Sequence, residues 1–410
     1  MNAITREIAD LAPDAAVKIV PYDGTFVEEV LAFKPDVILT FPMTSTGLAA
    51  PYYLFKHLFR TRVFCFRAEG IIDPGSPHSV ANHVGYDRYG PALVDGEIFW
   101  GPGPAKLIGD GLVASRKLSS VARVKCFGYP RLERYFGVPP APGLSAVPRA
   151  IAARLKAQGR ARTLLLATGF HFANYTREMI FAAKDLDADN RCDELLEIIE
   201  EVKRFRASWI RAVRQAAEEN PDLLFVLKKH PIELRRDYAE LEQIPNVLYV
   251  WQDVDIGDLM EQAGLFVHYG STSLADAYLA AVPAIYVHSR ETRCRNWFPD
   301  MGWPSARSVP SDQIPEIVRE YQSGHIEHNP NDAGIHAILD YNFNIRPGEA
   351  YRPSRTIAQY LLQDHEPQHI SLSDTHQWRP VSHHYYLALR RKVGRPIKRA
   401  LRAAWSRFQP

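Results

Sequence analysis

Two short segments in the second half of the chain carry side chains that can hold a phosphate group. Residues 229–231 supply a cation, an imidazole and a proline, and residues 270–273 supply a glycine and three hydroxyls. Their members are Lys229, His230, Pro231, Gly270, Ser271, Thr272 and Ser273. Cations, hydroxyls and backbone N–H groups are the donors that proteins direct at phosphate oxygens. Together the two segments predict the phosphate half of a nucleotide site.

The elements around these segments are expected to bring them to one edge of a sheet. Residues 223–228 and 265–269 are short apolar runs typical of buried strands, and each ends at one of the segments. Apolar residues with helical spacing follow Ser273, so the hydroxyls stand at a predicted helix start, where unpaired N–H groups and the helix dipole favour an anion. Open parallel sheets bind their ligands at the carboxyl ends of their strands.

Each segment also has an ordinary interpretation. Serine and threonine at a helix start are common N-caps, and a proline after a charged strand end is common in loops. Because the two segments occur together, about one βα unit apart, we favour a site.

The composition is that of a globular protein with room for two domains. The chain has 410 residues, of which 46% are hydrophobic and 23% charged, and a formal net charge of +2. Its cysteines are far apart, which disfavours a zinc site or a disulfide framework and suits a reducing cytoplasm. They are Cys65, Cys126, Cys192 and Cys294. The sequence shows no signal peptide and no run of about 18 apolar residues. A soluble or peripheral protein is therefore expected.

Strands and helices are predicted to alternate in two sets, which indicates an α/β fold with two Rossmann-like domains facing across a cleft. The first set has strands over 16–20, 37–41, 62–67, 96–100 and 123–127 and helices over 25–33, 50–59 and 104–110. The second has strands over 163–167, 223–228, 247–251, 265–269 and 284–287 and helices over 194–219, 256–262 and 274–281. The expected units are a first domain over 1–136, a linker over 137–160, a second domain over 161–375 and a tail over 376–410. The last helices of the second domain can return to the first.

Four motifs, in order, resemble those of the bacterial surface-carbohydrate-biosynthesis glycosyltransferases of GT-B architecture. They are Ala68-Glu69-Gly70, Gly128-Tyr129-Pro130-Arg131-Leu132-Glu133, Lys229-His230-Pro231 and Ser271-Thr272-Ser273. The chain is more distantly similar to bacterial sialyl- and polysialyltransferases, Kdo transferases and CDP-glycerol glycerophosphotransferases. The resemblance implies an acceptor domain followed by a nucleotide-donor domain. It also implies transfer of a sugar from a CMP- or CDP-linked donor to a surface polysaccharide or lipid-linked glycan.

The resemblance implies catalytic roles for two residues. Glu69 corresponds to the general base that accepts a proton from the attacking acceptor hydroxyl, although Ala68 stands where the relatives have a first acid. An ion pair of Glu69 with Arg67 or Arg88 is the alternative. His230 corresponds to the histidine that contacts the nucleotide phosphate or leaving group, and its alternative is a structural histidine that caps its own loop.

Three further residues are candidates for the cleft. Arg131 closes the first domain in the motif that it shares with the relatives, where it contacts donor or acceptor or forms a salt bridge between domains. Asn174 follows a predicted strand end, and Asp276 lies in the helix after the serine and threonine cluster.

No cofactor and no required metal are expected. Asp185, Asp187 and Asp189 have the spacing of metal-binding aspartates, but they lack the glycine and glutamate of an EF-hand and precede a helix instead of following a strand. The charge of a departing nucleotide is then met by side-chain donors, the helix dipole and Lys229.

The tail is basic and amphipathic. After Asp374 the chain has no acidic residue, and its cations alternate with apolar residues at spacings of three and four, interrupted by Pro396. This pattern fits an anchor on an anionic membrane surface, and a helix docked on the protein itself is the alternative. No nucleic-acid partner is expected, because no nucleic-acid-binding module accompanies the charges. We expect a cytoplasmic protein, peripheral on the inner face of the cytoplasmic membrane.

Two other functions stay open at this point. A glycerophosphotransferase that uses CDP-glycerol would need a similar nucleotide site. A catalytically inactive assembly subunit that binds a nucleotide-sugar would account for the missing first acid before Glu69.

Overall fold

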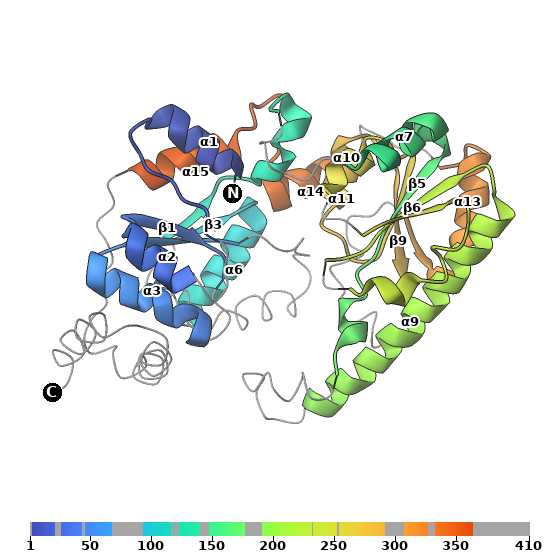
Figure 1. Ribbon diagram of the computed structural model, residues 1–410, viewed down its shortest axis with the longest axis horizontal. Helices are drawn as coiled ribbons and strands as arrows, with labels where there is room; N and C mark the ends of the chain where they lie inside the picture. Colours follow the sequence, from blue (N-terminus) through green and yellow to red (C-terminus); the bar gives the residue numbers. More distant parts are fainter. Residues whose placement is uncertain are drawn as a thin grey trace.

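The computed structural model describes residues 2–20, 26–42, 46–67, 93–115, 118, 123–139, 147–176, 191–231, 233–251, 254–291, 307–326 and 333–363. Within these ranges the chain forms two parallel β-sheets, each covered by helices (Figure 1). The predicted fold class, α/β with two Rossmann-like domains, is confirmed by this topology.

The first sheet has the strand order β1-β2-β3-β4. Its strands are β1 (Val37–Thr40), β2 (Arg62–Phe66), β3 (Gly96–Phe99) and β4 (Val124–Cys126). Side chains alternate between the two faces of a strand. Val63 and Cys65 of β2 therefore pack against helices on one face, and Phe64 and Phe66 belong to the core on the other face. The covering helices are α2 (Phe26–Phe33), α3 (Thr46–Phe59) and α6 (Pro102–Ala114).

The second sheet has the strand order β10-β9-β8-β5-β6-β7, and all its pairs are parallel. Its strands are β5 (Thr163–Ala167), β6 (Leu224–Lys228), β7 (Val247–Val250), β8 (Leu265–His268), β9 (Ala284–His288) and β10 (Arg307–Pro310). Numbered within the domain, this order is 3-2-1-4-5-6 from the other edge, the order of dinucleotide-binding folds. The first strand of the domain, β5, lies in the middle of the sheet. Strands β6 and β7 follow on one side of β5, and β8, β9 and β10 follow on the other side.

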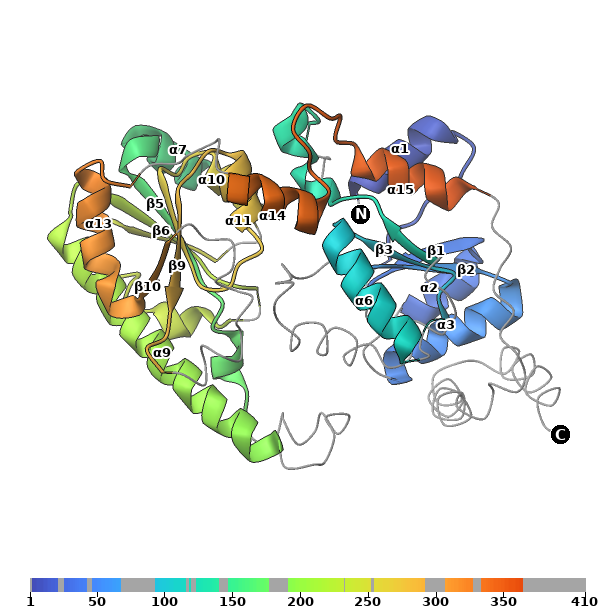
Figure 2. The same ribbon diagram turned by 180° about the vertical axis from the view of Figure 1, so that it is seen from behind.

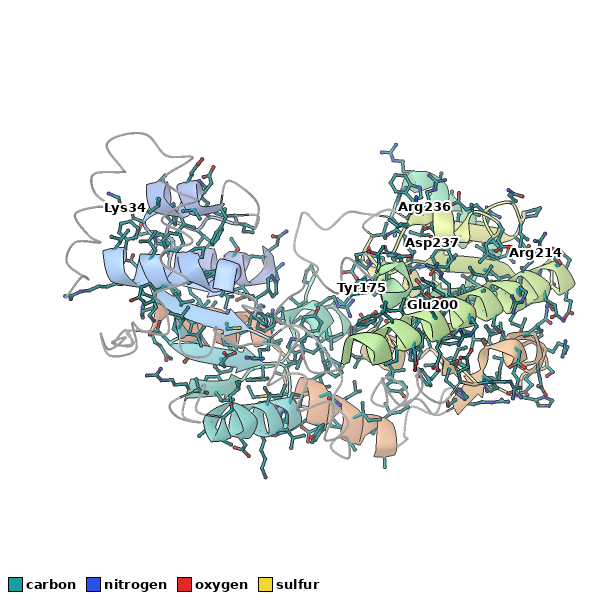
Figure 3. The ribbon with its side chains drawn as sticks, turned by 90° about the horizontal axis from the view of Figure 1, so that it is seen from below. Lys34, Tyr175, Glu200, Arg214, Arg236 and Asp237 are labelled. Carbon is teal, nitrogen blue, oxygen red and sulfur yellow. The ribbon has the colours of Figure 1, made fainter. Side chains whose placement is uncertain are left out.

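Helices cover both faces of the second sheet. The long helix α9 (Arg191–Glu219) follows β5 and buries Trp209 and Val213 against one face, where α13 (Ile314–Gln322) lies beside it. The other face is covered by α7 (Arg149–Gln158), α10 (Ile256–Met260) and α11 (Leu274–Leu279). Glu200 and Arg214 lie on the solvent side of α9, where their side chains are 59% and 50% exposed (Figure 3).

The chain returns to the first domain after α13. Helix α14 (Ala333–Phe343) packs against α6, and α15 (Pro353–Leu362) packs against α1 (Asn2–Leu11), as both ribbon views show (Figure 2). Ile357 of α15 and Ile4 of α1 are buried in the same core as Phe64. The two ends of the described chain therefore share one layer over the first sheet.

Most predicted elements are present within a few residues, with clear exceptions. Residues 16–20, predicted to be a strand, are irregular, because no neighbouring strand pairs with them and most of them are exposed. Strand β10 was not predicted, and the helices expected after about residue 311, which are α13, α14 and α15, were predicted without bounds. Helix α7 lies in the segment expected to be a linker and buries Ile151 and Leu155 in the core.

Several sequence predictions lie outside the described residues. They are Glu69, the aspartates Asp185, Asp187 and Asp189, and the tail over 376–410. Across the ranges that the structure covers, no helix combines the length and the apolar character needed to cross a bilayer.

Candidate functional site

The strand order of the second sheet reverses between β5 and β8. We call this topological switch point the change of direction of the sheet. The chain leaves β5 for β6 on one side and later enters β8 on the other. Helices α9 and α11, which follow these two strands, belong to the cores on opposite faces of the sheet. The loops after such strands separate at the carboxyl edge, which is where open α/β sheets bind ligands.

Both predicted segments start level with the end of β5. In the ladder, Ala167 pairs with Lys228 of β6 and with His268 of β8. Residues 229–231 and 269–273 therefore flank the loop that begins at Thr168. Because neighbouring strands lie about 4.8 Å apart, the two flanking strands are roughly 10 Å from each other. Sequence reasoning had placed the segments at one edge, and the ladder brings them to adjacent positions there.

The loop after β8 passes close to the loop after β5. A Cβ atom on Gly169 would lie 2.4 Å from the carbonyl oxygen of Tyr269, so only glycine allows this approach. The backbone N–H of Tyr269 donates to Ala167 O at 3.2 Å. These contacts fix the two loops against each other at the point where the sheet changes direction.

Lys229 and His230 form a compact turn after β6. The Lys229 ammonium donates to the carbonyl oxygens of His230 (3.1 Å) and Pro231 (3.0 Å). The N–H of Glu233 donates to His230 O at 3.0 Å, which closes a turn with Pro231 at its second position, a place that proline favours. The cation of Lys229 thus stabilises its own loop and adds positive potential at this edge.

The imidazole of His230 is half-buried beside two lysines. Burial, together with the charges of Lys229 and Lys228, lowers the pKa of His230 below its ordinary value. The neutral ring predominates at neutral pH, and a neutral imidazole offers one N–H donor and one acceptor. A phosphate bound against it would favour the protonated form.

Glu233 is a buried carboxylate that sequence reasoning missed. One of its oxygens accepts from His230 N at 3.0 Å and from the Thr168 hydroxyl, and the other accepts from Phe170 N. Burial raises the pKa of the Glu233 carboxyl, and these hydrogen bonds oppose the shift. The signal for this residue in the sequence was the presence of an acid two residues after the His-Pro pair.

The loop after β8 is held by a buried histidine and by its own hydroxyl. Ser271 N donates to Nδ1 of His268 at 3.4 Å, and Ser273 N donates to the hydroxyl of Ser271 at 3.2 Å. His268 is fully buried, which lowers the pKa of its imidazole to about 3 and keeps it neutral. Two of the amides at this helix start are therefore engaged within the loop, while Ser271 and Thr272 are partly exposed.

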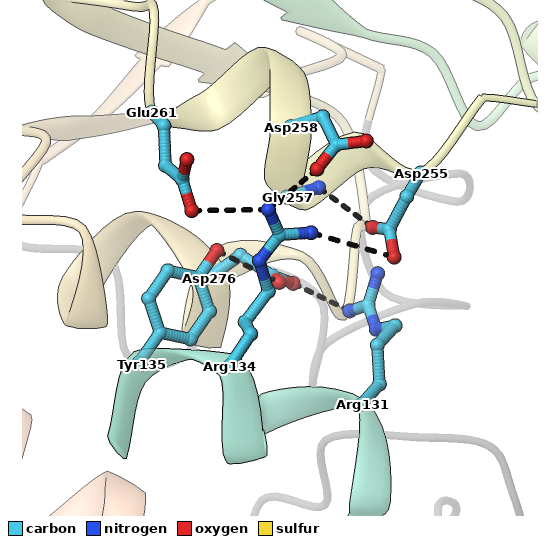
Figure 4. A network of polar contacts seen from close by, with 8 residues as sticks. All are labelled: Arg131, Arg134, Tyr135, Asp255, Gly257, Asp258, Glu261 and Asp276. Atoms are coloured by element: carbon cyan, nitrogen blue, oxygen red, sulfur yellow. Dashed lines mark hydrogen bonds and ion pairs between the residues drawn. The ribbon is translucent and has the colours of Figure 1, made fainter. Parts of the chain in front are cut away.

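Arg131 and Asp276 meet where the two domains touch. Asp276 is the third residue of α11 and is fully buried. Its carboxylate pairs with the Arg131 guanidinium and accepts from the Tyr135 hydroxyl at 3.1 Å (Figure 4). Burial raises the pKa of the Asp276 carboxyl, and the Arg131 charge opposes that shift. This is the interdomain salt bridge that was one of the two alternatives for Arg131.

Arg134 makes a second set of ion pairs in the same place. Arg131 and Arg134 both come from the short helix η2 (Pro130–Phe136), and Arg134 reaches α10 of the second domain. Its partners are Asp258, Glu261 at 3.0 Å and Asp255 at 3.6 Å. We call the contact of η2 with α10 and α11 the domain joint.

The same stretch of chain also holds the returning helices. Glu133 is buried and accepts from Ser354 N at 2.6 Å at the start of α15, where a carboxylate complements the helix dipole. The Tyr351 hydroxyl accepts from Tyr129 N at 2.7 Å, and Gly128 has φ of +94°, which favours glycine. The motif 128–133 is thus a structural junction of both domains.

The remaining candidate, Asn174, lies apart from these groups. Its side-chain oxygen accepts from Arg206 of α9 at 2.9 Å, and Arg206 also pairs with Asp237 at 2.9 Å. Within the described parts of the chain, no three histidine, cysteine, aspartate or glutamate side chains gather in a way that could hold a metal ion.

Solved structures with a similar arrangement include enzymes of nucleotide-sugar chemistry. UDP-GlcNAc 2-epimerase from Neisseria meningitidis, bound to UDP-GlcNAc, is 13% identical, with a TM-score of 0.46 over 88% of this chain and 89% of that one. UGT89C1 of Arabidopsis thaliana, complexed with UDP, is 13% identical, with a TM-score of 0.48 over 88% and 80% of the two chains. The wall teichoic acid polymerase TagF is 12% identical, with a TM-score of 0.47 over 88% and 84%. No family model and no curated protein sequence matches the chain. At these TM-scores the fold assignment stands on the strand order of the chain itself.

Proposed function

We propose that the protein is a GT-B glycosyltransferase that transfers a sugar from a CMP- or CDP-linked donor to a surface polysaccharide or lipid-linked glycan. One observation supports this most. The segments 229–231 and 270–273 flank β5 at the point where a 3-2-1-4-5-6 sheet changes direction. That is the position at which such folds bind the phosphates of a nucleotide.

The chemistry assigned to the second domain is stabilisation of a leaving nucleotide. As the bond from the anomeric carbon to phosphate breaks, negative charge grows on the phosphate oxygens. The hydroxyls of Ser271 and Thr272, the N–H of a neutral His230 and the positive potential near Lys229 can meet that charge. Such donors stabilise the transition state most when they are already oriented, and both loops are held by internal hydrogen bonds.

The first domain is proposed to bind the acceptor and to supply the base. Glu69, assigned by resemblance, would accept the proton of the acceptor hydroxyl as its oxygen attacks the anomeric carbon. In the sequence, Glu69 follows Phe66, the last residue of β2, by three positions. Carboxyl ends of strands are where this fold class places reacting side chains.

The test is a nucleotide-release assay. The full chain is incubated with CMP-, CDP-, UDP- and GDP-sugars and with CDP-glycerol, each with a panel of glycan acceptors, with and without EDTA, and free nucleotide is measured. We expect release from a CMP- or CDP-sugar that survives EDTA, since donors on the protein take the place of a metal. Release from CDP-glycerol alone would support the phosphotransferase. Thermal stabilisation by a nucleotide-sugar without turnover would support the binding subunit.

The tail is proposed to hold the enzyme at the inner face of the membrane, near lipid-linked acceptors. Each cation close to an anionic surface contributes roughly 1 kcal/mol. The full chain should sediment with vesicles that contain anionic lipid at low salt and be released as salt rises. A chain truncated after Trp378 is the control. Equal partitioning of the two would reject the membrane anchor.

A further inference from the structure

A buried carboxylate joins the loop after β5 to the loop that carries His230. Glu233 is 2% exposed, and its carboxylate accepts from His230 N, from Phe170 N and from the Thr168 hydroxyl. Thr168 and Phe170 belong to the loop at the change of direction of the sheet. Since β5 is the strand between the two phosphate segments, Glu233 links the His230 turn to the centre of the candidate site.

Glu233 contacts the backbone of His230 on both sides. Its N–H donates to His230 O at 3.0 Å, and its carboxylate accepts from His230 N at 3.0 Å. Thr168 Oγ1 accepts from the same His230 N at 3.0 Å and donates to Glu233. This reciprocal pattern fixes the Cα of His230, so that only the side-chain torsions remain to set the direction of the imidazole.

The bonds also explain why an acid is needed here. Two of the three donors are backbone N–H groups, which cannot reverse their direction, and an ionised carboxylate has acceptors only. An amide at this position would turn its NH₂ group toward one of these donors. A buried carboxylate is costly unless it is fully hydrogen-bonded, so its presence beside His230 indicates a gain in order at that loop.

We propose that Glu233 is a positioning residue for His230: its carboxylate fixes the turn after β6 against the loop after β5 and thereby aims the imidazole at the substrate phosphate. The statement that the imidazole is aimed at a substrate phosphate rests on the proposed function. The anchoring itself is independent of it. Small displacements of a group that acts in the transition state lower turnover strongly, whereas ground-state binding is spread over several contacts.

The experiment compares Glu233→Gln, and Glu233→Gln combined with Thr168→Val, with a matched control. The double variant also removes the hydroxyl acceptor of His230 N and leaves one amide oxygen to serve the two backbone donors, His230 N and Phe170 N. The control is Glu133→Gln, which alters a carboxylate that is also 2% exposed and also accepts from a backbone N–H and a hydroxyl, those of Ser354, but belongs to η2 of the first domain. Two quantities are measured: deuterium uptake in peptides that contain residues 168–170 and 229–233, and kcat and KM for the donor found by nucleotide release.

We expect uptake in both peptides to rise in the Glu233 variants and to stay at the wild-type level in Glu133→Gln. Turnover should fall about tenfold in Glu233→Gln and further in the double variant, with KM changed by less than about threefold. Unchanged uptake in the Glu233 variants would overturn the anchor. A loss of kcat no larger than that of Glu133→Gln, in correctly folded protein, would overturn the positioning role. If the wild type turns over no donor, the proposed function fails, and uptake alone still decides for or against the anchor.

Discussion

The loops at the change of direction of the second sheet and the domain joint are stabilised by different forces. The loops are held inside one domain by hydrogen bonds to neutral groups and by one buried carboxylate, that of Glu233. The joint is held between domains by two guanidinium groups, Arg131 and Arg134, paired with carboxylates of α10 and α11. One region orders two loops within a domain, and the other fixes two domains relative to each other.

This difference indicates how the two regions respond to perturbation. A carboxylate buried in an ion pair becomes strongly destabilising when its partner is lost, while a partly exposed pair changes stability little. Hydrogen bonds between neutral groups each contribute about 1 kcal/mol, so a loop can lose one without unfolding. Variants in the joint should therefore affect the stability of the whole protein, and variants in the loops should affect ligand chemistry.

The largest effect is expected at the joint. Arg131→Met leaves the carboxylate of Asp276 buried without its cation and should lower the free energy of unfolding by about 3–5 kcal/mol. The measurement is urea unfolding followed by fluorescence. In the double variant with Asp276→Leu most of the loss should be recovered, because no charge is left buried. Glu261→Gln, at a side chain that is 50% exposed, should cost less than about 0.5 kcal/mol. Equal effects of Arg131→Met and Glu261→Gln would remove the distinction between buried and exposed pairs.

The next effect belongs to the loops. His230→Ala should lower kcat about a hundredfold and change KM much less, because the donor that it removes acts on charge that appears in the transition state. Steady-state kinetics with the donor identified by nucleotide release measures both constants. The unfolding free energy should stay close to that of the wild type. A variant that retains full turnover would exclude His230 from the mechanism.

A pH effect should distinguish the buried histidine of the loops from the ion pairs of the joint. The folded-state pKa of His268 is about 3, against an ordinary value of 6.5. Below pH 6.5 the unfolded chain binds a proton that the folded protein does not, so stability falls as pH decreases toward 3. At pH 5 the loss relative to pH 7 from this group is about 2 kcal/mol. His268→Asn keeps an acceptor for Ser271 N and should show a shallower slope of unfolding free energy against pH. The same slope in both proteins would show that His268 is protonated in the folded state.

The smallest effect is expected for the hydroxyls. Ser271→Ala combined with Ser273→Ala should weaken nucleotide binding by about 1–2 kcal/mol and leave the fold intact, since each hydroxyl contributes about 1 kcal/mol. Isothermal titration with CMP measures the change. Ser323→Ala is the control, because this exposed serine lies at the end of α13. No difference between the double variant and the control would indicate that the phosphate binds elsewhere.

The strands of both sheets except β10 were predictable from sequence, and so was the place of residues 229–231 and 270–273 after two of these strands. Buried parallel strands have continuous apolar runs, as in residues 163–167 and 265–268, and charged or hydroxyl residues at their ends are visible directly. Residues 16–20 were mistaken for a strand because an apolar pattern does not report whether a pairing partner exists. The sequence predicted only some of the residues of the candidate site.

Contacts between residues distant in sequence account for what sequence reasoning missed. Glu233 is joined to Thr168 and Phe170, and Asp276 to Arg131, more than sixty residues apart in each case. A pattern of neighbouring residues in the sequence does not indicate contacts between residues so far apart. Arg134 was overlooked for the same reason, since its partners on α10 come from the other domain.

The most direct test of the account is a crystal structure of the protein soaked in parallel with CMP and with UDP. We predict that the nucleotide phosphate lies between residues 229–231 and 270–273, in contact with the Ser271 and Thr272 hydroxyls and the His230 imidazole. A nucleotide bound at another edge of the second sheet, or on the first domain, would contradict the assignment of these loops as the phosphate site.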